Sequence, residues 1–220
     1  MNNLVIRKTY SEPPFCEKEI LRYAGCRASD REIIALLESS AEEARKVLDY
    51  KVCYKELPVS VAGEICVFSE FSVQSQKLAA NLKECESVIL FAATVGHGID
   101  RLIAKYGRIS PSRALMLGAI GAERIEALCD AFCQDISNEK KITLKPRFSP
   151  GYGDLPLSAQ KDIFNTLNCS KHIGLFLSDS LIMTPSKSVT AFAGVGGEKT
   201  QTVNKCSYCD KINCTFRGAL

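Results

Sequence analysis

Residues 147–156 read RFSPGYGDLP, and the rest of the chain is organised around this turn-rich stretch. Pro146, Pro150 and Pro156 restrict the backbone here, while the two glycines admit conformations that other residues avoid. Such a loop offers backbone groups to a ligand. Its cation is Arg147, and a guanidinium pairs with a carboxylate through two parallel hydrogen bonds. The loop is therefore a candidate anion site, and the alternative is a tight connection whose arginine is merely solvated.

Length and charge exclude several classes of protein. The chain has 220 residues, enough for one domain with a sizeable core. Its formal net charge is +3, and its cations are scattered among acids without the basic stripe that nucleic-acid binding needs. No run approaches the ~20 apolar residues of a membrane span, and residues 1–15 lack the apolar region of a signal peptide. We therefore expect a cytoplasmic protein with no nucleic-acid partner and no membrane partner.

The first half of the chain alternates helical and strand patterns. Apolar residues at helical spacing predict a helix over Asp30–Tyr50, which Ser29 and Glu32 begin with a capping box. β-Branched and aromatic residues between 52 and 73 predict strands joined by a turn. A second helix is expected over Ser75–Glu84.

Residues 87–100, SVILFAATVGHGID, predict a strand, a glycine turn and a third helix. The turn matches neither the dinucleotide-binding nor the phosphate-loop glycine pattern, which favours a simple tight turn. A short β-type run covers 142–144, and a further helix is expected over Ser158–Leu167. Alternation at 175–177 and in the SVTAFAG run at 188–194 predicts strands packed on a long helix.

That long helix should begin with Ser110 as N-cap and Pro111 in its first turn, and continue to about Ile136. One face carries small and apolar residues with a single carboxylate, Glu126. The face consists of Leu115, Ala119, Ala122, Glu126, Cys129 and Cys133. Because burying an unpaired charge is costly, Glu126 must turn to solvent, find a cationic partner, or receive a ligand's ammonium group.

Residues 147–189 carry a more specific pattern, which resembles the activation domain of cobalamin-dependent methionine synthase, the region that binds S-adenosylmethionine. The Arg-x-x-Pro-Gly-Tyr motif of that family corresponds to Arg147, Pro150, Gly151 and Tyr152. The later part of the pattern, with matching spacing, consists of Ile173, Gly174, Leu177, Ser180, Met183, Pro185, Ser188 and Val189. The chain departs from the family at Ala193 and Gly194, where an aromatic pair is expected, and at Leu157 and Ser158, which replace Asp-His.

The resemblance implies an α+β fold with a twisted antiparallel β-sheet flanked by α-helices. We expect one domain of this kind over residues 1–200, with a helical N-terminal part over about residues 1–60, followed by a cysteine-containing tail over 201–220. In this family the residue matched by Arg147 would hold the carboxylate of S-adenosylmethionine. Backbone groups of Arg147, Ser149 and Gly151 would contact other polar edges, and Tyr152 would line the pocket. We add Glu126 and Ser188 as cofactor-binding candidates.

The resemblance also implies a partner. The chain has only His97 and His172, and neither lies in the DxHxxG pattern that supplies the lower cobalt ligand in corrinoid-binding domains. We therefore expect cobalamin to be presented by a separate cobalamin-binding methionine synthase subunit. A low-potential electron donor such as flavodoxin or ferredoxin would reduce the cobalt, and this protein would hold S-adenosylmethionine for its reductive methylation. The chain would then be a methyltransferase component that reactivates methionine synthase.

The tail suggests a second possibility. Cys206, Cys209 and Cys214 are spaced as CxxCxxxxC, and three convergent thiolates can bind one metal. Zinc, an iron–sulfur cluster and a redox-active thiol group remain open, as does a tail of free thiols. The alternatives to reactivation are thus a metal or iron–sulfur redox protein and a non-catalytic adaptor for a corrinoid protein. The remaining cysteines of the eleven read as reduced thiols.

Overall fold

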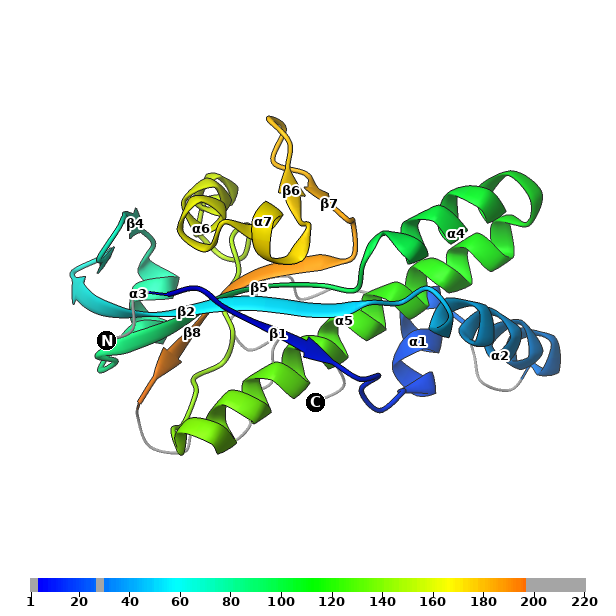
Figure 1. Ribbon diagram of the computed structural model, residues 1–220, viewed down its shortest axis with the longest axis horizontal. Coiled ribbons are helices and arrows are strands. Elements are labelled where there is room, and N and C mark those ends of the chain that lie inside the picture. Colours follow the sequence, from blue (N-terminus) through cyan, green and yellow to red (C-terminus); the bar gives the residue numbers. More distant parts are fainter. Residues whose placement is uncertain (1–3, 27–29, 197–220) are drawn as a thin grey trace.

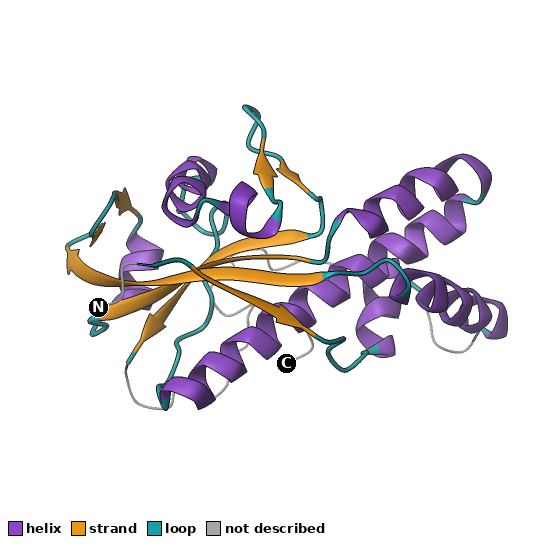
Figure 2. Cartoon of the chain, viewed as in Figure 1, coloured by secondary structure: helices purple, strands orange, loops and turns teal. Residues whose placement is uncertain are grey.

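The fold is seen in a computed structural model that describes residues 4–26 and 30–196 (Figure 1). Helices and strands are interleaved along this part of the chain (Figure 2). In order, they are β1 (Ile6–Tyr10), α1 (Glu17–Ala24), α2 (Arg31–Arg45), β2 (Tyr50–Ala62), β3 (Ile65–Phe68), β4 (Ser72–Gln74), α3 (Gln76–Leu82), β5 (Ser87–Thr94), α4 (His97–Ile109), α5 (Pro111–Lys140), the 3-10 turn η1 (Leu157–Ala159), α6 (Gln160–Leu167), α7 (Cys169–Ile173), β6 (Phe176–Leu177), β7 (Met183–Thr184) and β8 (Ser188–Val195).

An antiparallel sheet forms the centre, with strand order β4-β3-β2-β5-β8 and β1 paired to the first part of β2. Its register places Tyr54 opposite Phe91, and Phe91 opposite Ala191. All residues of β5 are buried, because β5 has a strand on each side and helices over both faces. Strands β6 and β7 form a separate hairpin. The expected α+β fold, an antiparallel sheet flanked by helices, is confirmed.

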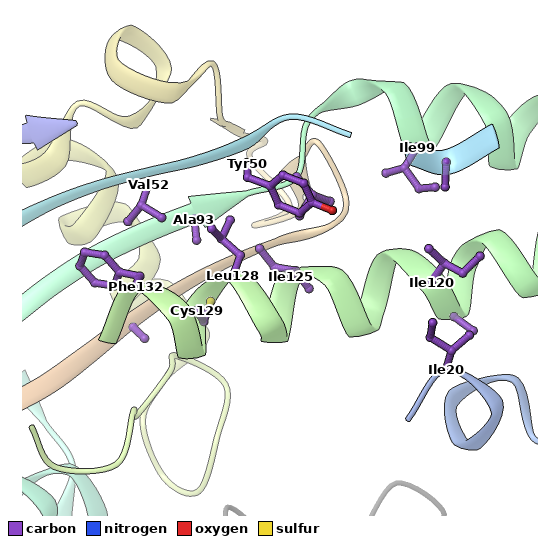
Figure 3. Packing of buried hydrophobic residues seen from close by; sticks show 14 of the residues in the cluster. Ile20, Tyr50, Val52, Ala93, Ile99, Ile120, Ile125, Leu128, Cys129 and Phe132 are labelled. Atoms are coloured by element: carbon purple, nitrogen blue, oxygen red, sulfur yellow. The ribbon is translucent and has the colours of Figure 1, made fainter. Parts of the chain in front are cut away.

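Alternation along the strands divides the core between the two faces of the sheet. Ile89, Phe91 and Ala93 belong to the cluster that packs against α5, where the rings of Phe91 and Phe132 are 4.8 Å apart. Figure 3 shows side chains of this cluster between the sheet and α5. Residues of the opposite parity, such as Leu90, pack with α3, α6 and α7. The sheet is therefore a layer between two sets of helices, as Figure 1 shows.

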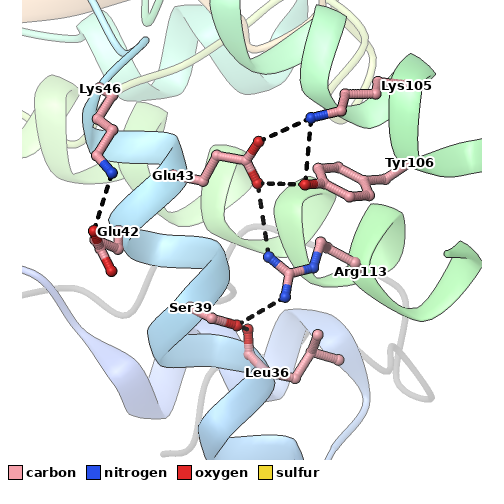
Figure 4. Close-up of polar contacts among 8 residues, drawn as sticks. All are labelled: Leu36, Ser39, Glu42, Glu43, Lys46, Lys105, Tyr106 and Arg113. Atoms are coloured by element: carbon pink, nitrogen blue, oxygen red, sulfur yellow. Dashed lines mark hydrogen bonds and ion pairs between the residues drawn. The ribbon is translucent and has the colours of Figure 1, made fainter. Parts of the chain in front are cut away.

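A polar network holds α2 against α4 and α5 (Figure 4). The Glu43 carboxylate accepts a 2.7 Å hydrogen bond from the Tyr106 hydroxyl and pairs with Lys105 at 3.3 Å and Arg113 at 3.6 Å. Arg113 also donates to the Ser39 hydroxyl at 3.0 Å. The hydrogen bond from Tyr106, followed by the neighbouring cations, lowers the pKa of Glu43.

The beginning of α2 and its end differ from the sequence-based expectation. The helix ends at Arg45, and Tyr50 instead begins β2, where its side chain is buried. The N-cap is Asp30, whose carboxylate accepts from the Glu32 amide at 2.9 Å, while Ser29 lies outside the described residues. Strand pairing with β1 and β5 thus takes over residues whose spacing also suited a helix.

Other boundaries were also misplaced. Helix α5 continues beyond Ile136 to Lys140 and ends where Lys141 adopts a left-handed conformation, φ 56°. Residues 142–144 form no strand, only an isolated bridge from Leu144 to Val195. The part before residue 60 is not simply helical, since it contains β1 and most of β2. Strand β8 packs on the long helix as expected, but β6 pairs with β7 away from it.

Expectations for the remaining helices were closer. Ser75 is the N-cap of α3, which ends at Leu82, and the helix predicted over 158–167 begins as the turn η1 and continues as α6. The glycine turn after β5 leads directly into α4, as the sequence indicated. Within residues 4–26 and 30–196, no helix is both long and apolar enough to cross a membrane.

Candidate functional site

Residues 144–148, which include the first two residues of the RFSPGYGDLP loop, lie along the free edge of β8. Phe148 exchanges two backbone hydrogen bonds with Phe192, of 2.9 and 2.8 Å, and Leu144 forms a bridge to Val195. The Phe148 side chain enters the core beneath α6 and α7. Because neighbouring residues of an extended segment point to opposite faces, Arg147 is directed toward α5.

Arg147 makes its contacts with two carboxylates of α5. Its Nη2 donates to Glu126 Oε2 at 2.9 Å, and its Nη1 donates to Asp130 Oδ1. The Arg147 side chain is only 14% exposed, whereas those of Glu126 and Asp130 are 37% and 56% exposed. The guanidinium is thus held at the boundary between the core and the surface, with the carboxylates on its outer side.

The charge of this cluster follows from its surroundings. Burial opposes the positive charge of Arg147, but the neighbouring acidic groups, Cys129, Asp130, Cys133 and Glu126, raise its pKa above the usual value. Burial also raises the pKa of the Cys129 thiol, so this thiol stays protonated at neutral pH. The charged partners of Arg147 are therefore the two carboxylates.

The turn that follows presents some backbone groups and uses others internally. The Gly151 amide donates to the Leu155 carbonyl at 3.0 Å, and the Tyr152 amide donates to the Ser149 carbonyl at 3.2 Å. Gly151 has φ 87°, a conformation that favours glycine. The Tyr152 side chain is 66% exposed and lies at the surface of the loop. Of the groups that the family resemblance assigned to a ligand, the Gly151 amide is already bonded within the turn.

Asp154 fixes the far end of the loop, a role that the sequence did not reveal. Its carboxylate accepts from the Gln76 amide at 2.6 Å, from the Lys77 amide at 3.2 Å, and from the Ser75 hydroxyl. These groups form the beginning of α3. Since Ser75 and Asp154 are 79 residues apart in the chain, no local pattern could have paired them.

The structure brings together some of the predicted site residues. Glu126 takes the second of its three expected roles, a cationic partner, and the partner is Arg147. Asp130 was missed, although its position four residues after Glu126 places both on one helix face. Ser188 is 8% exposed, and its hydroxyl lies 2.8 Å from both Thr94 Oγ1 and the Pro185 carbonyl oxygen, away from the contacts of Arg147.

The proposed metal ligands Cys206, Cys209 and Cys214 lie outside the described residues, so their role stays a prediction. Within 4–26 and 30–196, no group of three or more His, Cys, Asp or Glu side chains is arranged to hold a metal ion. The eight cysteines of this part of the chain are free thiols, five of them buried.

No protein-family model matches the chain, and no curated protein matches its sequence. The antiparallel sheet lies between α5 on one face and α6 and α7 on the other, so the chain is an α+β protein with a three-layer arrangement. Comparison with solved structures identifies a protein that shares this fold. The chain is similar to a structure described as "Crystal Structure of the MetH Reactivation Domain bound to AdoHcy", with a TM-score of 0.65 over 90% of this chain and 80% of that chain. Sequence identity is 15%. The chain therefore has the fold of the methionine synthase reactivation domain, which confirms the fold that the sequence resemblance implied.

Proposed function

We propose that this protein binds S-adenosylmethionine at the Arg147 loop and supports the reductive methylation of cob(II)alamin on a separate methionine synthase. The observation that carries the proposal is the Arg147 cluster at the edge of β8, within a fold whose solved neighbour was crystallised with AdoHcy. The sequence motif at 147–152 and the similarity of the fold to a structure bound to AdoHcy both favour this class of ligand.

The donor set fits the amino-acid end of such a ligand. An α-amino acid carries a carboxylate and an ammonium group side by side. Arg147 supplies a largely buried, permanently charged guanidinium for the ligand's carboxylate. Glu126 supplies a partly exposed carboxylate for the ligand's ammonium group. The ring of Tyr152, in the same loop as Arg147, is exposed and offers an apolar surface to a ligand. When bound, the ligand supplies an electrophilic methyl group on its sulfonium, and the protein's own residues would bind, orient and shield it from water.

Cobalamin would come from a partner, since neither His97 nor His172 lies in the sequence pattern of a cobalt ligand. Flavodoxin or ferredoxin would supply the electron. We propose a small and transient interface, because a permanent complex would keep the substrate domains of the synthase from its cobalt. In this role the protein is a methyltransferase component rather than a complete enzyme.

Calorimetric titration with S-adenosylmethionine tests the binding step. We expect saturable binding to one site per chain. Adenosine, which lacks the amino-acid end, should bind much more weakly, because it offers nothing to Arg147 and Glu126. Folded protein that takes up no S-adenosylmethionine would contradict the proposal. If adenosine and S-adenosylmethionine bound with equal affinity, the binding site would not include the Arg147 cluster.

A further inference from the structure

The glycine turn between β5 and α4 borders a cavity that the proposed function does not use. The cavity has a volume of about 510 Å³, within the range of about 300–1,000 Å³ that small-molecule sites occupy. It lies where β2 begins and β5 ends, and the end of α7 and the segment after β7 complete it (Figure 1). Glu126, Asp130 and Arg147 are not among the described residues that line it, so the cavity is separate from the Arg147 cluster.

Backbone packing accounts for both glycines of the turn. Gly96 has φ 84°, a conformation that favours glycine. A Cβ at Gly98 would lie 2.2 Å from the Val47 carbonyl oxygen, in the segment between α2 and β2. The glycines are therefore required by the fold itself, and a ligand would be recognised by the side chains around the cavity.

Three of these side chains carry N–H donors, namely Lys51, His97 and Arg101. Lys51 is paired with the carboxylate of Asp49, which also lines the cavity. The side chains of His97 and Arg101 are exposed, and neither makes a hydrogen bond or an ion pair with another described residue. Because the charges of Lys51 and Asp49 cancel, Arg101 gives the lining a net positive charge and a guanidinium open to an anion.

Asp100 precedes Arg101 in the chain, but its carboxylate is bonded elsewhere. It accepts hydrogen bonds from the Ser186 amide at 2.7 Å and from the Ser186 hydroxyl at 2.6 Å. These bonds hold the segment after β7 against the first turn of α4, where Pro185 lines the cavity. Pro185 and Ile173 give the cavity an apolar wall, and small-molecule sites commonly combine such a wall with a few polar groups.

We propose that this cavity binds a small organic anion, in which a carboxylate or phosphate group is carried on an apolar body. Arg101 would hold the anionic group through two parallel hydrogen bonds, and His97 would donate one more. The apolar body would lie against Ile173 and Pro185. This site goes beyond the proposed function and does not depend on it, because it shares no residue with the Arg147 cluster.

The test is a titration of the full chain with phenyl phosphate and with benzoate, followed in amide NMR spectra. We expect saturable shifts at Gly96, Gly98 and Gly174, which line the cavity. Inorganic phosphate, which has no apolar body, should bind more weakly. Arg101→Ala should weaken binding by about fivefold or more, because a charged donor is lost. Arg108→Ala is the matched control and should bind as the wild type does, since Arg108 is an exposed arginine of the same helix outside the cavity lining.

Thermal unfolding of each variant checks that it is folded before its titration is interpreted. Binding of one of the two anions would support the proposal and identify the group that the cavity takes. The proposal would be overturned if neither anion gave saturable shifts, or if Arg101→Ala and Arg108→Ala weakened binding equally, which would indicate attraction by overall charge. Binding that is lost in Arg147→Ala and kept in Arg101→Ala would place the anion at the Arg147 cluster and also overturn it.

Discussion

Arg147 combines a largely buried side chain, 14% exposed, with a permanent charge, and it is the residue on which ligand binding should depend. We predict that Arg147→Ala weakens S-adenosylmethionine binding by about 1.5–3 kcal/mol, the scale of a hydrogen bond to a charged group. Calorimetry measures the change. Arg113→Ala is the control, because Arg113 is likewise an arginine paired with a carboxylate, Glu43, but it lies on α5 and belongs to the network with α2. Equal affinities in the wild type and folded Arg147→Ala would remove this residue from the site.

A second arginine, Arg124, has a structural role. Its side chain is completely buried, bonded to Glu123 at 2.5 and 2.6 Å and to the carbonyls of Pro13 and Pro14 at 2.6 and 2.7 Å. We predict that Arg124→Met lowers the free energy of unfolding by about 3–5 kcal/mol, because it leaves the buried Glu123 carboxylate unpaired. Urea unfolding measures the loss.

Arg45→Met is the control for this change. Arg45 stacks on the same ring as Arg124, that of Phe15, but its carboxylate partner Glu12 is at the surface. The control should cost about 1 kcal/mol or less. Equal losses in the two variants would show that the buried ion pair contributes no more than a surface pair.

For individual residues, the sequence predicted those that stand in a recognisable local pattern and missed those whose partners are distant in the chain. Arg147 stands in a motif of prolines and glycines, and Glu126 interrupts an apolar helix face. Arg124 had no such signature, because a buried arginine bonded to distant carbonyls reads like any charged helix residue. Asp154 was missed for the same reason, since its partners at the start of α3 are brought to it only by the fold.

Helix α5 offers a test at the scale of the element, in two glycines of different surroundings. A Cβ at Gly121 would lie 2.9 Å from Lys187 Cγ, whereas a Cβ at Gly118 would meet nothing within 4 Å. We predict that Gly118→Ala raises the free energy of unfolding by about 0.5–1 kcal/mol through its better helix propensity. Gly121→Ala should give no gain or a loss, because Lys187 must move. Urea unfolding of both variants measures the change in the free energy of unfolding. Equal increases in the two variants would mean that Lys187 is not held against the helix.

Asp154 joins the site loop to α3, and its contribution should depend on pH. Partial burial works against its ionisation, but hydrogen bonds from Ser75 and from the amides of Lys77 and Gln76 lower its pKa overall. A lowered pKa means that the folded state favours the carboxylate. Its stabilisation is complete above the ordinary aspartate pKa of about 3.9 and is lost as the pH falls through the lower, folded value.

We therefore predict that Asp154→Ala costs about 1–2 kcal/mol of unfolding free energy at pH 7, the range of a helix cap. The cost should shrink as the pH is lowered below 4, because the wild type then loses the same interactions. Asp179→Ala, in the exposed turn between β6 and β7, is the control and should have little effect at either pH. A cost that is independent of pH would contradict the role given to the carboxylate.

The elements themselves were largely predictable, since apolar periodicity and caps mark α3, α4, α5 and the strands β2, β5 and β8. The prediction failed where the same residues fit both a helical pattern and a strand pattern. Residues 46–50 suit a helix, but tertiary pairing with β1 and β5 begins a strand at Tyr50. Strand β1 and helix α1 were not anticipated, because each is short and becomes stable only by packing on β2 and on α5.

At the scale of the whole molecule, the order of the strands was beyond reach from local patterns. Strand β8 pairs with β5 although the paired residues are 94 to 108 positions apart in the sequence, and the loop beginning at Arg147 then adds to the edge of β8. The family resemblance implied an antiparallel sheet flanked by helices but no strand order, and the fold comparison confirmed that fold at 15% identity. The proposed binding residues come from α5 and from this added edge, so they meet only in the assembled fold.

The most direct measurement of the central claim is a spectral titration of cobalt. This protein is mixed with the Co(II) form of a cobalamin-binding methionine synthase, S-adenosylmethionine and a low-potential donor. We predict that the absorption of methylcobalamin appears, that it fails to appear when either this protein or S-adenosylmethionine is left out, and that Arg147→Ala slows it while Arg113→Ala does not. Methylation that proceeds equally fast without this protein, or that never proceeds with any corrinoid partner supplied, would contradict the claim.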